Sequence, residues 1–167
     1  ERAHHQILFS RSQTYRPRHL TALIEDDRLL FEHWTHDASV IPSAFFPYWK
    51  HRFVRREARI LENWRKWQGE GFDKAFEETY ARIRDGGPVM ARDVKAEDHK
   101  SGGWWNWHPS KTALEFLWHT GKLSIARREG FQKVYGLSER VIPAEHHAAE
   151  VEHESFVDWA CRAALTR

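Results

Sequence analysis

Cysteine is nearly absent from this sequence of 167 residues, which has only Cys161. One cysteine excludes an internal disulfide bond and is typical of a reducing, cytoplasmic setting. The sequence also lacks any apolar run close to the roughly 20 residues of a membrane-spanning helix, and it shows no signal peptide. We therefore expect a cytoplasmic protein that does not associate with membranes.

Several enzyme motifs are missing as well. The sequence has no glycine-rich phosphate-binding loop, no Gly-x-Ser-x-Gly nucleophile elbow and no paired cysteines that could bind a metal. Its best acid–base cluster contains Glu32, His33 and His36; in a helix, Glu32 and His36 would lie one turn apart and could hold a water molecule. Without an obvious third ligand, we expect no metal and no cofactor. We expect His36 and Asp37 to stabilise a helix end, with a role near an active site as the alternative.

The composition is that of a globular protein with an uneven charge. Hydrophobic residues make up 41% of the chain and include nine tryptophans, enough to bury a core. Residues 1–67 hold 12 Lys and Arg against 8 Asp and Glu, and residues 104–140 hold 6 against 3. Two basic zones separated by acidic ones suit a surface that contacts a nucleic-acid backbone, although an ordinary solvated surface gives the same pattern.

The first part of the chain is predicted to be mostly helical. Residues 4–11 are typical of a short buried segment, and residues 20–34 carry apolar side chains at helical spacing. A long helix is expected after Pro47, with Arg and Lys between its apolar positions and an end at Gly69.

The later part predicts a helix, a short helix, a third helix and a β-hairpin, in that order. The expected ranges are 72–83, 89–94, 109–120, and strands at 123–127 and 131–135. This is the order of a winged helix-turn-helix. In that fold the third helix can enter the major groove, while the hairpin reaches phosphates or the minor groove.

This order predicts which side chains contact DNA. Ala113, Leu114 and Leu117 share the inner face of the third helix. The expected DNA contacts are Lys111, Thr112 and His119 on its outer face, and Arg127, Arg128 and Lys133 on the hairpin. Winged helices also serve as protein-binding or architectural modules, so the pattern alone leaves a module that binds no DNA open.

A tryptophan-rich segment precedes the third helix. Trp104, Trp105 and Trp107 could stack on bases. We favour the alternative, in which they hold the glycine-rich segment against the third helix.

Several stretches resemble the winged-helix DNA glycosylases of the YcaQ/AlkZ type, bacterial enzymes that excise alkylated purines. The stretches are Arg2–His5, Leu8–Arg11, Glu32–His36, Gly87–Pro88, Ala91–Asp93 and, the longest and most specific, Gly103–Pro143. The resemblance covers nearly the whole chain. It implies a mostly α-helical fold with small β-hairpin wings, arranged as a tandem winged helix-turn-helix.

The resemblance and the element order divide the chain into three parts. Residues 1–68 correspond to the C-terminal part of a first winged-helix unit with connecting helices, 69–143 to a complete winged helix-turn-helix, and 144–167 to the start of a third helical unit. We expect a fragment of a longer protein. The family's catalytic signature, Gln, an apolar residue, then Asp or Gln, is expected upstream of Glu1.

The function that the resemblance implies is DNA repair by a monofunctional DNA glycosylase. Such an enzyme hydrolyses the N-glycosidic bond of alkylated purines. The resemblance also implies that the base can react without entering a snug pocket, in which case interstrand crosslinks would be substrates too. Its partner is double-stranded DNA, and we expect a monomer. This chain would supply scaffold and DNA-binding surface, with Glu32 and His36 as supporting catalytic candidates. The alternative is a winged-helix transcription regulator without enzymatic activity, against which the lack of a clear dimerisation helix argues.

Overall fold

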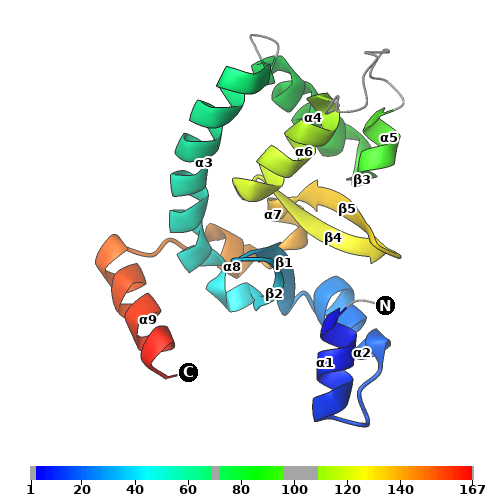
Figure 1. The fold of residues 1–167 in the computed structure, drawn as a ribbon, viewed down its shortest axis with the longest axis vertical. Helices are drawn as coiled ribbons and strands as arrows, with labels where there is room; N and C mark the ends of the chain where they lie inside the picture. Colours follow the sequence, from blue (N-terminus) through cyan, green and yellow to red (C-terminus); the bar gives the residue numbers. More distant parts are fainter. Residues whose placement is uncertain (1–2, 69–71, 96–108, 167) are drawn as a thin grey trace.

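The computed structural model describes residues 3–68, 72–95 and 109–166 (Figure 1). In chain order the elements are α1 (Ala3–Arg11), α2 (Pro17–Thr21), the π-helical turn η1 (Ala22–Asp26), β1 (Leu30–Trp34), β2 (Ala38–Pro42), the 3-10 turn η2 (Ser43–Phe45), α3 (Phe46–Gln68), α4 (Phe72–Gly86), β3 (Val89–Met90), α5 (Ala91–Lys95), α6 (Pro109–His119), β4 (Leu123–Glu129), β5 (Gln132–Leu137), α7 (Ser138–Val141), α8 (Ala144–Ala148) and α9 (His153–Leu165). Helices predominate and both sheets are small, which confirms the predicted mostly α class. Within the described ranges, no helix is long and apolar enough to span a membrane.

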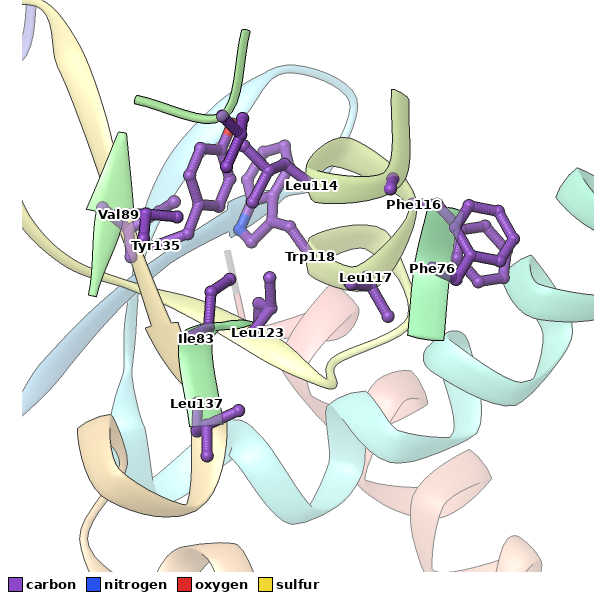
Figure 2. Close-up of a cluster of buried hydrophobic side chains, with 13 residues drawn as sticks. Phe76, Ile83, Val89, Leu114, Phe116, Leu117, Trp118, Leu123, Tyr135 and Leu137 are labelled. Atoms are coloured by element: carbon purple, nitrogen blue, oxygen red, sulfur yellow. The ribbon is translucent and has the colours of Figure 1, made fainter. Parts of the chain in front are cut away.

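Helix α6 lies at the centre of the larger hydrophobic core. Figure 2 shows Phe116 of α6 against Phe76 of α4; the two rings stack with centroids 4.1 Å apart and an interplanar angle of 9°. On another side of α6, Leu114 and Trp118 lie near Tyr135 of β5. Contacts with α3, α4, α5, β1 and β4 enclose α6, so most of its side chains are buried.

The predicted order of helix, short helix, helix and hairpin is present over residues 72–137. Strands β4 and β5 form the antiparallel hairpin, and β3 adds a third strand in the order β3-β5-β4. The structure shortens the predicted helix over 89–94, because Val89 and Met90 pair with Tyr135 and Val134 before α5 begins.

The helix expected over residues 20–34 is wrong beyond Asp26. Arg28, with φ of 53°, takes the left-handed conformation that turns the chain after η1. Residues 30–34 then form β1, in which Glu32 lies opposite Val40 of β2. The middle of β1 is buried on both faces although Glu32 and His33 are polar, so the strand lacks the alternation of apolar and polar residues that would identify it.

Helix α1 also differs from its prediction as a buried segment. It has no buried residue, and Ile7 and Phe9 are 51% and 46% exposed. A smaller hydrophobic core lies instead between the β1–β2 hairpin and α3; its buried members are Phe31, Ile41, Phe46, Trp49, Phe53 and Ile142.

Gly121 ends α6, as predicted, and it also allows α3 to pack closely. Its φ is 74°, and a Cβ atom at this position would overlap the Phe53 ring of α3. Gly130, in the β4–β5 turn, has a similar φ of 60°, but nothing lies within 4 Å of a Cβ added there. The two glycines therefore share a backbone conformation and differ in available space.

We predict that Gly121→Ala lowers the free energy of unfolding by about 2–5 kcal/mol, because it combines left-handed strain with overpacking. Gly130→Ala carries only the strain and should lower it by about 1–2 kcal/mol. Urea denaturation of both variants measures the difference. Equal losses would show that the Phe53 ring moves aside at no cost.

Candidate nucleic-acid interface

Strand β1 is joined to α6 by hydrogen bonds in both directions. The Trp118 indole of α6 donates to the Glu32 carbonyl over 3.1 Å, and His33 Nε2 donates to the Trp118 carbonyl over 2.9 Å. Trp118 and His33 are 1% and 3% exposed. Buried polar groups of this kind are costly to leave unpaired, so these bonds fix the register of β1 against α6.

The Glu32 side chain forms a buried ion pair with the hairpin. Arg128 of β4 donates from Nε over 3.0 Å and from Nη2 over 2.6 Å to Glu32 Oε2, and its Nη1 donates to the Phe131 carbonyl over 2.7 Å. The Glu32 side chain is 3% exposed and that of Arg128 18%. Arg128 thus fixes both the Glu32 carboxylate and the β4–β5 turn.

A second internal ion pair lies between β5 and α6. Lys133 Nζ is 3.0 Å from Glu115 Oε1 and 3.6 Å from the centre of the Trp118 ring, and the Tyr135 hydroxyl donates to Glu115 over 2.5 Å. Burial lowers the pKa of Lys133 and raises that of Tyr135, while Glu115 opposes the first shift and adds to the second. The Lys133 charge is therefore balanced within the protein.

Two histidines at this junction are held neutral. Burial lowers the pKa of His33 to about 4, and burial together with the nearby Arg56 lowers the pKa of His119 to about 4. Arg56 Nη1 of α3 donates to His119 Nδ1 over 2.7 Å. A guanidinium only donates, so His119 must accept at Nδ1 and carries its ring proton elsewhere.

The structure places few of the predicted DNA contacts on an open surface. Thr112 is 2% exposed, so its predicted outward position is wrong; α6 is enclosed by neighbouring elements rather than lying on the surface. His119 is partly buried beside Arg56, and Arg128 and Lys133 are in the internal ion pairs.

Lys111 and Arg127 are the exposed members of the predicted set. Arg127 bonds Glu129 on its own strand over 2.8 Å. No observation tests whether any of the six side chains contacts DNA, so those roles stay predictions.

Glu32 and His36 do not form the predicted pair. Glu32 lies within β1, whereas His36 is exposed in the turn between β1 and β2 and stabilises no helix end. The chain leaves β1 after Trp34 and bends before β2 begins at Ala38, so no helical turn brings Glu32 and His36 together. Among the residues that the structure describes, no three His, Cys, Asp or Glu side chains gather to hold a metal ion. Trp104, Trp105 and Trp107 lie outside the described residues.

A pocket of about 270 Å³ opens beside Glu32, where β4 contacts η1. Its polar lining comprises His5, Thr21, Glu25, Glu32 and Arg128. His5 Nδ1 is 2.7 Å from the Tyr15 hydroxyl. Sequence spacing could not reveal this pocket, because its walls come from α1, α2, η1, β1 and the β4–β5 hairpin.

A model of the AlkZ-like DNA glycosylase family matches residues 1–167. The chain belongs to the AlkZ-like DNA glycosylase family. Membership supports the resemblance found in the sequence and a role in DNA repair. No solved structure matches the chain. The polar pocket and the basic side chains around α6 are therefore features of a protein from a DNA-binding, base-excising family.

We predict that Arg128→Met in this glycosylase-family chain lowers the free energy of unfolding by about 3–5 kcal/mol, because it leaves the Glu32 carboxylate buried without a counter-charge. Glu32→Leu combined with Arg128→Met should lose less than the two single changes together. Arg127→Met, on the same strand but exposed, should change stability by less than about 0.5 kcal/mol. Urea denaturation measures all four; similar losses for Arg127 and Arg128 would contradict the ion pair's role.

The buried histidines predict a loss of stability in mild acid. Their pKa values are lower in the folded than in the unfolded chain, so the unfolded chain binds protons first and stability falls as the pH drops from about 6.5 toward 4. Between pH 7 and pH 4.5, His33 alone should account for about 2 kcal/mol. His33→Gln should flatten the dependence over this range in urea denaturation, and an unchanged slope would contradict it.

Proposed function

We propose that this chain belongs to a DNA glycosylase that hydrolyses the N-glycosidic bond of alkylated purines in duplex DNA. The match of the family model to residues 1–167 carries this proposal. The topology supports it, because the helices, the three-stranded sheet and the hairpin over residues 72–137 follow the order of a winged helix. We propose further that this unit is one of a tandem and that the chain acts as a monomer.

The reaction needs little acid catalysis. An N7-alkylated purine is cationic, so the C1′–N9 bond is already weakened, and its electron pair returns to the ring when the bond breaks. Water adds to C1′ and releases one proton, and the base leaves as a neutral molecule. The protein has to position that water and stabilise a sugar with positive charge. Bulky lesions, including interstrand crosslinks, are substrates only if the base can react outside a snug pocket.

The pocket beside Glu32 has the charges for such a sugar. Two carboxylates, Glu25 and Glu32, line it together with one guanidinium, Arg128, so the excess charge is negative. Glu32 accepts from Arg128 and keeps that side chain and the hairpin turn in position. We therefore assign Glu32 a positioning role, and Glu25 electrostatic stabilisation of the cationic sugar. His36, exposed in the β1–β2 turn, is not assigned a part in this pocket.

Base release from N7-methylated duplex DNA tests the function, measured with the whole polypeptide that carries this sequence. We expect release from the methylated duplex and none from the undamaged one. Glu25→Gln should slow release about tenfold, equivalent to roughly 1.4 kcal/mol of charge stabilisation. Glu154→Gln on α9 removes the same charge from an exposed position and should leave the rate unchanged.

The outcomes separate the parts of the proposal. No release by the whole polypeptide would contradict the glycosylase function, and sequence-specific binding without release would favour a regulator. An unchanged rate of release in Glu25→Gln would contradict the proposed role of the pocket but not the glycosylase function. Release by the 167-residue chain alone would show that the groups activating water lie within these residues.

A further inference from the structure

Helix α3 carries a row of arginines along one face. Arg52, Arg55, Arg56 and Arg59 follow the spacing i, i+3, i+4 and i+7, which places them on one side of a helix. We call these residues the arginine stripe. The sequence shows them as basic residues between the apolar positions of the predicted helix. The structure adds that Phe53 of this helix faces the core and that Arg55 and Arg59 are exposed.

The described part of the protein does not neutralise the arginine stripe. Among the residues that the structure describes, no carboxylate forms a salt bridge with any of the four arginines. Glu57, on the same helix, is instead 3.2 Å from Lys122. Burial lowers the pKa of Arg52 and Arg56, and neighbouring arginines lower it further: Arg55 for Arg52, and Arg52 with Arg59 for Arg56. Like charges one turn apart destabilise a free helix, and a bound polyanion would reverse that effect.

The inner two arginines are held in place by uncharged groups. The Arg52 guanidinium lies 4.7 Å from the centre of the Trp49 ring and donates to the Thr35 carbonyl over 3.3 Å. Arg56 donates to the neutral His119. Both keep their full charge and further N–H donors. Arg55 and Arg59 are exposed and make no hydrogen bond with the described part of the chain.

We propose that the arginine stripe binds successive phosphates of a duplex DNA backbone. Seven residues of helix extend about 10 Å, which is the axial rise of about three nucleotides of one strand. Guanidinium groups suit this ligand because their planar donors bind phosphate oxygens in pairs. This inference rests on the proposed function, since it takes duplex DNA as the substrate.

The position of the stripe favours DNA as its ligand. His119, at the end of α6, and Thr35, in the β1–β2 turn, both contact it, so it borders the helix predicted to meet DNA. Helix α6 is itself enclosed by neighbouring elements, and α3 is one of them and lies beside it (Figure 1). The arginine stripe therefore places positive charge on α3, beside α6.

The test is the salt dependence of binding to an undamaged 20-base-pair duplex, followed by fluorescence anisotropy with the whole polypeptide. Arg55→Gln with Arg59→Gln removes two phosphate contacts and should reduce the slope of log affinity against log salt by about 1.8. Between 50 and 200 mM salt, the fall in affinity should then be about 12-fold smaller than in the unchanged protein. Arg55→Lys with Arg59→Lys keeps both charges and should keep most of the slope.

The matched control is Lys74→Gln with Arg162→Gln, which removes the same charge from exposed positions on α4 and α9. An equal change of slope in this control would show a general effect of net charge and overturn the proposal. An unchanged slope in Arg55→Gln/Arg59→Gln, in a protein that still binds duplex and releases methylated bases, would contradict phosphate binding by the arginine stripe. It would not contradict the glycosylase function. No duplex binding by the unchanged protein would contradict the function itself.

Discussion

The contact between β1 and α6 determines how the rest of the molecule is arranged. Trp118 donates to the backbone of β1, and His33 of β1 donates back to the backbone of Trp118. The same strand presents Glu32 to Arg128 on the hairpin. Residues that the sequence assigns to two units therefore share one buried polar network. Removing any residue of this network leaves a buried polar group of another residue without its hydrogen-bond partner. The network therefore fixes the position of the β4–β5 hairpin relative to the β1–β2 sheet.

This network determines which basic residues of the second unit have a charge available to bind phosphates. Arg128 and Lys133 lie on a hairpin where a winged helix would contact phosphates, yet a carboxylate already satisfies each of them. The partner of Arg128 is 96 positions away in the sequence, so spacing cannot reveal whether the arginine is free. In α3 the opposite holds: no carboxylate of the described residues pairs with Arg52, Arg55, Arg56 or Arg59, and Arg55 and Arg59 are exposed. A basic residue can act on DNA in the free protein only to the extent that its own fold leaves it unbalanced.

The sequence predicts the long elements well and the short ones poorly. Helix α3 after Pro47, the end of α6 before Gly121 and the β4–β5 hairpin were all predictable, because each has a sustained period or a glycine that the backbone requires. Strand β1 was not, since a short segment buried on both faces shows neither period. The outward position of Thr112 failed for another reason: a helix with one apolar face can still be buried on the other when long-range packing covers it. The pocket beside Glu32 depends on five separate elements and had no local signal.

Under the proposed function, the charge distribution suits a cationic lesion in a polyanionic substrate. An N7-alkylated purine and the sugar it leaves behind are positively charged, so arginines near the reacting bond would oppose the reaction, whereas arginines on the backbone would not. The structure separates the two: the arginine stripe lies on α3, and the pocket with Glu25 and Glu32 lies across β1 beside the hairpin turn. Among the described residues that line that pocket, Arg128 is the one arginine, and Glu32 neutralises it. The buried ion pair fixes the hairpin, and under the proposed function it would also neutralise a positive charge beside the cationic sugar.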